Sequence, residues 1–415
     1  MNIIQIIPGS GGSFYCGNCL RDSKYVDALK AQENKVVKIP MYLPLFSDEH
    51  DISDIPVFYG AISVYLKQMF PVFRHAPAWF DKLLNSKPMM KMAASMSGST
   101  RATGLEDMTV SMLLGEEGEQ KEELDKMIDW IAEHCKPDIV HLSNALLLGL
   151  ARRIKEKLNI PVVCSLQDED VWVDVMQPQF RDRVWKLMGE KANNVDAFIP
   201  VSDYYSGLAQ ERMNIPDEKL FTVHLGVDPA DYQYANSVQK KERNIGFISR
   251  ISPINGLHVL VDAFILLKKK PENHDVHLHI TGGYTGDDKK YVKELKDKLA
   301  ANGLMDDSHF WKKFEGEHRE HFFERMQVIS VPVPHGEAFG IYLTESMASG
   351  IPVVQPDTGA FPEIIAAGGG GVAYSPNTPE KLSESLSELI NDTQQLEKLS
   401  IKARKSVEEH FDINI

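Results

Sequence analysis

The stretch VPVPHGEAFGIYLTESMASGIPVV, residues 331–354, carries two glutamates, Glu337 and Glu345, that are eight residues apart. A loop that contains Gly336 and Gly340 comes first, a segment with helical spacing follows, and a short strand closes the stretch. A helix that begins near Gly340 points its backbone N–H groups and a partial positive charge at an anion bound before it. The stretch therefore predicts a loop–helix junction with an anion at the helix start and two carboxylates close by.

The segments on both sides of this stretch alternate short apolar strands with amphipathic helices. Strands are expected at residues 3–7, 36–39, 139–142, 162–165 and 198–201, and again at 245–248, 276–281, 328–331 and 353–354. Helices are expected at residues 146–158 and 257–267, and from Pro379 onwards. This alternation predicts an α/β protein with two Rossmann-like, doubly wound parallel sheets that face each other across a cleft. Ligands of such sheets bind outside the carboxyl ends of the strands.

The chain length of 415 residues favours two domains over one. The polar stretch DPADYQYANSVQKKERN, which begins at Asp228, has the composition of an interdomain linker. We therefore expect a first domain at residues 1–228, a linker at 229–243 and a second domain at 244–415.

Residues 56–123 interrupt the strand–helix alternation of the first domain and are rich in methionine and aromatic residues. One interpretation is an inserted helical subdomain with a small core of its own. The other is a surface that binds an acceptor or touches a membrane through residues 56–100, since Met-rich and aromatic amphipathic helices suit both. Both interpretations stay open at this point.

The formal charge of −14 argues against nucleic acid as a partner, because affinity for phosphate backbones comes from clustered Lys and Arg. The four cysteines are too few for a disulfide framework, which favours a reducing compartment. The N-terminus MNIIQIIPGS has the pattern of a buried strand rather than a signal peptide, and no apolar run is long enough to span a bilayer. We therefore expect a cytoplasmic protein, with peripheral contact to the inner face of the membrane as an open option.

A glycine-rich loop, PGSGGSFYCGNCLRD, follows the first strand and opens a helix, so Gly11 and Gly12 are candidates for contact with a phosphate. A dinucleotide fingerprint would need glycine where Phe14 stands, and an acidic residue at the end of the second strand, where VVKIP has none. An NAD-dependent Rossmann oxidoreductase therefore remains only a weaker alternative. Cys16 and Cys19 form a single C-x-x-C pair, which suits packing or a turn, or else a redox role, better than a zinc site.

In context, the two glutamates eight residues apart resemble the donor-site signature of retaining glycosyltransferases with the GT-B fold, most nearly glycosyltransferase family 4. Further segments resemble the same family, and together they cover nearly the whole chain outside the insert. They are PDIVHLSN (137–144), NIPVVCSLQDED (159–170), VHLGVD (223–228), GFISRISPINGLHVLVDAF (246–264) and LHITGG (278–283).

This resemblance implies transfer of a sugar from a nucleotide-diphosphate sugar, with retention and without a metal ion or cofactor. It implies that Glu337 contacts the sugar hydroxyls, that Arg250 stabilises the leaving diphosphate, and that Glu345 accepts the ribose hydroxyls. The full donor-binding set that it implies is Gly11, Gly12, Arg250, Asn255, Gly283, Glu315, Ala338, Phe339, Gly340, Ile341 and Glu345. Contacts to the base are expected from the backbone around residues 314–316. The acidic run DED at residues 168–170 is expected to line the cleft rather than to bind a metal.

The sequence departs from the family pattern in three places. Asn255 stands where relatives usually have a lysine, so one cation for the diphosphate is missing. Ser143 and Gln167 stand where relatives often have an active-site histidine, while His141 has a strand position that favours burial. The chain ends at HFDINI, where relatives usually continue into a last helix that returns to the first domain.

The residues Ser143, Asn144, Gln167 and Asp168 remain candidates for the acceptor side of the cleft. The acceptor itself is open between a carbohydrate, a lipid and another small molecule. Three functions follow from these observations: an active retaining glycosyltransferase, a nucleotide-sugar-binding homologue that has lost catalysis, and the Rossmann oxidoreductase. A nucleotide-sugar 2-epimerase is a related option within the same fold.

Overall fold

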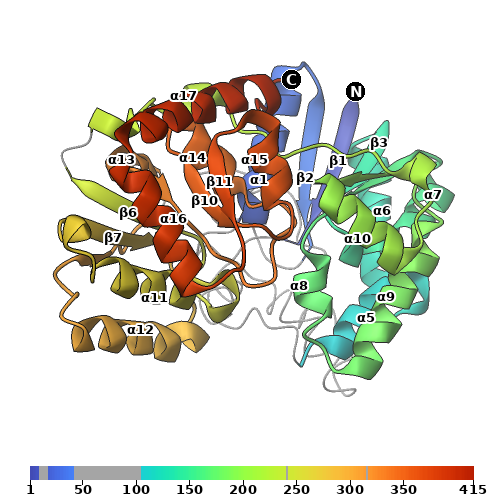
Figure 1. Ribbon diagram of the computed structural model, residues 1–415. Coiled ribbons are helices and arrows are strands. Elements are labelled where there is room, and N and C mark those ends of the chain that lie inside the picture. Colours follow the sequence, from blue (N-terminus) through green and yellow to red (C-terminus); the bar gives the residue numbers. More distant parts are fainter. Residues whose placement is uncertain (9–16, 42–103, 240–241, 315) are drawn as a thin grey trace. The chain divides into compact units, whose positions relative to one another are not determined.

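The computed structural model describes residues 1–8, 17–41, 104–239, 242–314 and 316–415, with the backbone alone at Cys19, Leu20 and Gln239 (Figure 1). The predicted phosphate loop with Gly11 and Gly12, the Cys16–Cys19 pair and Glu315 therefore lie outside the described side chains. Contacts divide the chain into two compact units. The first comprises Met1–Gly12 and Asp22–Val223, and the second comprises Ser13–Arg21 and His224–Ile415.

The first unit is built on a five-stranded sheet in the order β2-β1-β3-β4-β5, and each neighbouring pair is parallel. Its strands are β1 (Asn2–Ile7), β2 (Lys35–Pro40), β3 (Ile139–Leu142), β4 (Val162–Leu166) and β5 (Ala197–Pro200). All five expected strands are confirmed, with ends within one residue. The order is a doubly wound one, and it reverses between β1 and β3, where ligands of such sheets bind.

The helices of the first unit follow the strands as predicted, with one correction. They are α1 (Gly17–Ala31, in this unit from Asp22 on), α5 (Glu106–Leu114), α6 (Lys121–His134), α7 (Ala151–Leu158), α8 (Glu169–Val173), α9 (Pro178–Ala192) and α10 (Asp203–Met213). The expected helix at residues 146–158 begins instead as a 3-10 helix, η3 (Ala145–Leu150), and only then becomes α7. Asn159 ends α7 in the left-handed region, which asparagine tolerates well.

The described end of the predicted insert belongs to the first unit. Helix α5 packs against α9 and η3, and its Val110 and Leu113 are buried. A Cβ at Gly115 would stand 2.0 Å from the carbonyl oxygen of Gly149, so α5 and η3 approach at backbone distance. The idea of a separate core is therefore wrong for residues 106–123. The expected acceptor or membrane surface at residues 56–100 lies outside the described residues and stays a prediction.

The second unit has a six-stranded parallel sheet in the order β11-β10-β9-β6-β7-β8. Its strands are β6 (Arg243–Ile248), β7 (Val276–Thr281), β8 (Ser308–Phe310), β9 (Val328–Ile329), β10 (Val353–Pro356) and β11 (Gly371–Tyr374). Read from β8, this is the strand order of a Rossmann fold, and it reverses between β6 and β9. The four expected strands are confirmed, although β9 is shorter than expected, and β8 and β11 were missed.

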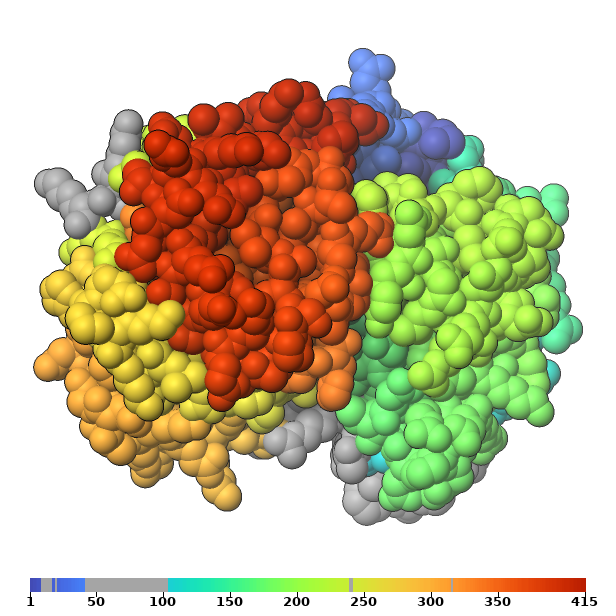
Figure 2. Space-filling model, in the orientation of Figure 1, coloured from blue at the N-terminus to red at the C-terminus, as the bar shows by residue number. Residues whose placement is uncertain are grey.

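The helices of the second unit cover this sheet, and α16 and α17 lie on the outside of the unit in the view of Figure 2. They are α11 (Leu257–Leu267), α12 (Lys289–Ala301), α13 (Glu317–Arg325), α14 (Ile341–Ala348), α15 (Phe361–Gly368), α16 (Pro379–Asn391) and α17 (Thr393–His410). The predicted start of α16 is confirmed, because Thr378 caps it by accepting the N–H of Lys381.

The stretch expected to be a linker, 229–243, packs on the second unit in its described part. Tyr232 is 7% exposed and Ser237 is fully buried. The Ser237 hydroxyl donates to the carbonyl of Gly350 at 3.1 Å, and the Arg404 guanidinium donates to the carbonyl of Tyr232 at 2.9 Å. The polar composition of this stretch therefore reflects hydrogen bonding to its own unit rather than a solvated linker.

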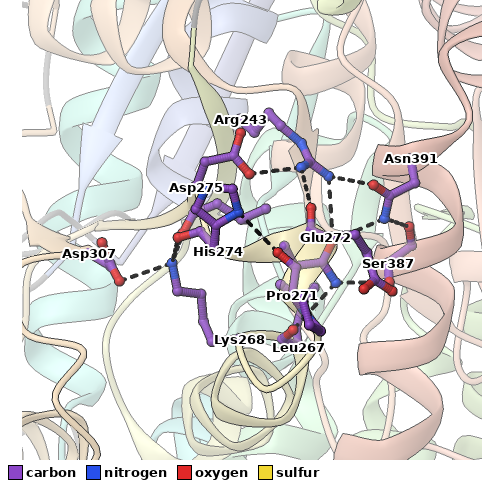
Figure 3. Close-up of polar contacts among 12 residues, drawn as sticks. Arg243, Leu267, Lys268, Pro271, Glu272, His274, Asp275, Asp307, Ser387 and Asn391 are labelled. Carbon is purple, nitrogen blue, oxygen red and sulfur yellow. Dashed lines mark hydrogen bonds and ion pairs between the residues drawn. The ribbon is translucent and has the colours of Figure 1, made fainter.

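A polar network lies at the amino ends of β6 and β7, opposite the carboxyl ends of the strands of the second sheet (Figure 3). Arg243 donates to Asp275 at 2.8 Å, to the carbonyl of Glu272 at 2.7 Å and to Asn391 at 2.8 Å. Lys268 bonds Asp307 at 2.9 Å. Ligands of doubly wound sheets bind at the opposite, carboxyl edge, so we assign this network to stability.

Candidate active site

The loop–helix junction predicted from residues 331–354 is present at the carboxyl edge of the second sheet. Gly340 precedes α14 with a φ of 86°, and a Cβ there would stand 2.7 Å from a methyl group of Leu343. Gly336 has a φ of 79°, and a Cβ there would stand 2.6 Å from the backbone nitrogen of Gly359. Both positions require glycine, so the bend that aims the start of α14 out of the sheet is fixed by these two residues.

Glu337 lies on the loop just before α14, as predicted, and is partly exposed. Its carboxylate accepts a hydrogen bond from the Tyr342 hydroxyl at 2.6 Å, and its carbonyl accepts the N–H of Ala360 at 3.1 Å. The backbone and the carboxylate are therefore both held in place while part of the side chain faces solvent.

Glu345 lies within α14 and is 0% exposed. The Tyr232 hydroxyl donates to its Oε1 at 2.8 Å, and the Arg319 guanidinium lies 3.4 Å from the same atom. Burial and the neighbouring carboxylate of Glu345 raise the pKa of Tyr232 well above its usual value, so the phenol stays a hydrogen-bond donor. Sequence reasoning missed both partners, since Tyr232 lies in the presumed linker and Arg319 belongs to no motif.

Arg250 follows β6, and its guanidinium is mostly buried. Its Nη2 donates to Asp288 at 3.0 Å and to the Thr285 hydroxyl at 3.2 Å. Asp288 and Thr285 are themselves joined in a capping box. A carboxylate that sequence reasoning missed therefore orients the predicted diphosphate-binding arginine and offsets part of its charge.

The glycine turn after β7 and the loop after β6 lie against each other. The N–H of Ile251 donates to the carbonyl of Gly283 at 2.8 Å, and a Cβ at Gly282 would stand 2.0 Å from the carbonyl oxygen of Ser249. Asn255 donates its amide to the carbonyl of Arg250 at 2.7 Å. In this structure the asparagine thus supports the loop that carries Arg250.

The remaining predicted donor residues contribute little side-chain surface. Ala338, Phe339 and Ile341 are each less than 5% exposed, so a ligand would meet their backbone rather than their side chains. The expected base contacts around residues 314–316 centre on Glu315, which lies outside the described residues.

At the carboxyl edge of the first sheet, the structure brings the predicted acceptor residues together. Gln167 donates its amide to the carbonyl of Ser143 at 3.3 Å, and both residues are buried. The Asn144 side chain caps η3 by accepting the N–H of Leu146 at 3.1 Å. The expected burial of His141 is confirmed, since it is 9% exposed and hydrogen-bonded to Ser165 at 2.8 Å.

Sequence reasoning missed Glu169 as an individual residue within the acidic run 168–170. It is 2% exposed and accepts hydrogen bonds from the backbone of Ala145 and Gln167 and from the Tyr205 hydroxyl. Burial raises its pKa to about 7, against the opposing effect of these hydrogen bonds. Its partners come from distant parts of the chain, so no local motif marks it.

The described part of the chain contains no cluster of three or more His, Cys, Asp or Glu side chains arranged for a metal ion. None of its helices is both long and apolar enough to cross a membrane.

The family model described as Glycosyl transferases group 1 matches residues 231–406, and the model described as Glycosyltransferase Family 4 matches residues 121–231. The chain is a relative of the family 4 glycosyltransferases. An uncharacterized glycosyltransferase of Methanocaldococcus jannaschii is 24% identical over 73% of this chain and 77% of its own length. The lipopolysaccharide core biosynthesis mannosyltransferase LpsB of Rhizobium meliloti is 27% identical over 57% of this chain and 61% of its own length.

Solved structures show the same fold for this glycosyltransferase relative. Anabaena HepE matches with a TM-score of 0.66 and 19% identity, over 100% of this chain and 96% of HepE. Sucrose-phosphate synthase from Thermosynechococcus elongatus matches with a TM-score of 0.71 and 16% identity, over 99% of this chain and 94% of its own. The predicted GT-B fold, with two Rossmann-like parallel sheets, is therefore confirmed.

Proposed function

We propose that the protein is a retaining glycosyltransferase that moves a sugar from a nucleotide-diphosphate sugar to an acceptor without a metal ion. The observation that carries this proposal is the loop–helix junction at residues 336–345. It combines a partly exposed, oriented carboxylate at Glu337 with the start of α14. The first turn of a helix has backbone N–H groups without helical partners, and these suit a phosphate.

Each residue around this junction has a role that its contacts support. Glu337 would bind hydroxyls of the donor sugar, because the Tyr342 hydroxyl holds its carboxylate in one orientation. Arg250 would neutralise charge that develops on the leaving diphosphate, from a position set by Asp288. Glu345 would accept the ribose hydroxyls, with its carboxyl group held by Arg319. This last role requires the ribose to reach a carboxylate that is fully buried here.

Relatives support a nucleotide sugar as the donor. HepE has been crystallised with UDP, with UDP and glucose, and with UDP-glucose. Several similar curated proteins are named D-inositol 3-phosphate glycosyltransferase, and LpsB is named a mannosyltransferase. We assign acceptor binding to the carboxyl edge of the first sheet, where Ser143, Asn144, Gln167 and Asp168 lie. A carbohydrate, a lipid or another small molecule fits this proposal.

A second function, nucleotide-sugar binding without catalysis, is favoured by two contacts. The charge of Arg250 is shared with Asp288, and the Asn255 amide is engaged with the carbonyl of Arg250. The first contact reduces the positive charge available to a leaving diphosphate, and the second occupies an amide that could otherwise donate to it.

Thermal shift of the full chain with NAD, and with UDP, GDP, ADP and their glucose and mannose conjugates, tests binding, because a ligand of the folded state raises the melting temperature. NMR of the mixtures then shows whether the sugar is released or transferred, and whether the anomeric configuration is kept. We expect one nucleotide family to stabilise the protein and its sugar conjugate to turn over. Stabilisation without turnover would favour the binding homologue, and stabilisation by NAD alone would favour the oxidoreductase.

A further inference from the structure

Glu169 joins three segments of the first unit at the carboxyl edge of its sheet. Its Oε1 accepts the N–H of Ala145 at 2.8 Å, in the turn after β3. Its Oε2 accepts the N–H of Gln167 at 2.8 Å, in the turn after β4, and the Tyr205 hydroxyl at 2.7 Å, from α10. The roles proposed above for the donor and acceptor residues make no use of this carboxylate.

These hydrogen bonds are needed, because buried backbone N–H groups are costly without a partner. Ala145 is fully buried and Gln167 is 4% exposed, so water is a poor substitute for the carboxylate. A carboxyl group can accept at both of its oxygens, whether it is ionised or carries a proton on one of them, whereas an amide offers one oxygen and one NH2 group that only donates. A glutamine at position 169 would therefore leave one of the two backbone N–H groups facing a donor.

The segment between the two turns is held in an uncommon conformation. Asp168 has a φ of 51°, in the left-handed region that few residues other than glycine adopt. The residue before it is bound through its N–H to Glu169. The residue after it is bound through its own N–H to the Tyr205 hydroxyl at 2.7 Å. These two bonds fix both sides of Asp168 and so maintain its left-handed backbone.

We propose that Glu169 is a positioning residue, which holds the turns after β3 and β4 in the conformation that presents Ser143, Asn144, Gln167 and Asp168 to an acceptor. The part about the acceptor rests on the proposed function, whereas the part about the turns rests on the hydrogen bonds alone. Tyr205 shares the task, since its hydroxyl bonds the carboxylate and the N–H of Glu169.

The ionisable groups around Glu169 also give the proposal a pH-dependent signature. The Tyr205 hydroxyl lies between Glu169 and Asp170, at 2.7 and 3.0 Å, and Asp168 and Asp174 lie near this group. In the hydrogen-bonded conformation of the two turns, which we call the closed state, burial raises the pKa of Glu169 to about 7. In an open state, with these hydrogen bonds broken and Glu169 in water, its pKa returns toward the ordinary value. The closed state therefore binds the proton more tightly, and opening becomes easier as pH rises. The turns should therefore open more easily above pH 7 than below it.

The test is residue-level hydrogen exchange on the full chain, corrected for intrinsic exchange rates, from pH 6 to 8. In Glu169→Gln we expect at least one of the amides of Ala145 and Gln167 to exchange about tenfold faster at pH 6, with the pH dependence of the wild type lost. Tyr205→Phe keeps the ring and should speed exchange at the amide of Glu169. Equal protection of all three amides in wild type and variants would overturn the proposal.

A matched control is Asp196→Asn, at the other end of β4. Asp196 lies just before β5 and accepts the backbone N–H of Val162, the buried first residue of β4, at 2.8 Å. It also forms an ion pair with Lys155 at 2.6 Å. This variant should speed exchange at Val162 and leave Ala145 and Gln167 as in the wild type. Loosening of all these amides to the same degree in both variants would show general destabilisation and would count against a positioning role.

Turnover of UDP-glucose, used as the probe donor, tests the link to the acceptor. Glu169→Gln should lower kcat about tenfold and leave KM for UDP-glucose within about twofold, because Glu169 lies in the first unit, whereas every predicted donor residue apart from Gly11 and Gly12 lies in the second. Loosened turns with an unchanged kcat would overturn the link. If the wild type neither binds nor turns over any nucleotide sugar, the proposed function fails, and the exchange data still decide whether Glu169 holds the turns.

Discussion

The carboxyl edges of the two sheets each contain a buried glutamate, and the two are held in different ways. Glu345 in the second unit has a guanidinium at 3.4 Å and a phenol at 2.8 Å. Glu169 in the first unit accepts bonds from two backbone N–H groups and a phenol, and the contacts of the described residues give it no cationic partner. A cation offsets the cost of burying a carboxylate, whereas hydrogen bonds alone leave the pKa of Glu169 raised to about 7.

The second edge therefore pairs its buried carboxyl group with a cation, whereas the first edge holds an acid whose pKa of about 7 makes it change its charge near neutral pH. Under the two proposals above, the carboxyl edges of the two sheets have different roles. The edge of the second sheet binds the charged donor, and Glu169 at the edge of the first sheet holds the turns after β3 and β4.

The largest effect is expected at the second edge from Glu337→Gln. Replacing this carboxylate removes a charge that would interact with the reacting sugar, so kcat with the nucleotide sugar should fall about 10³-fold. The melting temperature should change little, because Glu337 is only partly buried. Glu380→Gln, on the exposed start of α16, is the matched control and should keep full activity. A Glu337→Gln variant with wild-type kcat would remove the chemical role from this edge.

The next effect is on stability, from Glu345→Ala. The substitution leaves Arg319 and the Tyr232 hydroxyl without the carboxylate they bind, which should lower the free energy of unfolding by about 3–5 kcal/mol in urea titrations. Glu242→Ala is a matched control, because it breaks an ion pair with Arg325 in which both side chains are about half exposed. That loss should stay below about 1 kcal/mol. Equal losses in the two variants would contradict the distinct status of Glu345.

The pH dependence of Glu169 is the third test. Its pKa is raised from 4.5 to about 7 in the folded state, so the folded protein binds this proton more tightly than the unfolded chain. The resulting stabilisation is full below about pH 4.5 and is lost as pH rises through about 7. Relative to Glu169→Gln, the wild type should therefore lose about 2–3 kcal/mol of unfolding free energy between pH 5 and 8.

Urea titrations of both proteins at several pH values measure this difference. Asp196→Asn provides the control, because the pKa of Asp196 is lowered, so that carboxylate stays charged throughout this range. The control should keep the pH dependence of the wild type. A constant difference between wild type and Glu169→Gln from pH 5 to 8 would mean that Glu169 does not change its charge there.

The same contrast explains what the sequence could and could not predict. Glu337, Gly340 and Glu345 lie within one short motif, and their loop–helix geometry could be predicted because neighbouring residues determine it. Glu169 takes its partners from residues 24 and 36 positions away, so its role depends on how the strands are arranged. Strand β8 is SHF and strand β11 is the partly exposed GVAY, so neither has the apolar run that marks a buried strand.

The smallest expected effect concerns Asn255, where the donor edge has an amide in place of a cation. Asn255→Lys adds a positive charge beside Arg250 but removes the hydrogen bond to its carbonyl, at 2.7 Å. The charge should dominate for a ligand with a diphosphate, and we expect the dissociation constant for UDP to fall up to about tenfold at low salt. Asn255→Gln keeps an amide and is the control for the lost bond. If Asn255→Lys binds UDP more tightly at low salt and loses this gain as salt increases, the donor edge suits a charged ligand but lacks one cation for its diphosphate. Weaker binding by both variants would instead mean that Asn255 serves the loop of Arg250, so that hydrogen bonding and not net charge limits this edge.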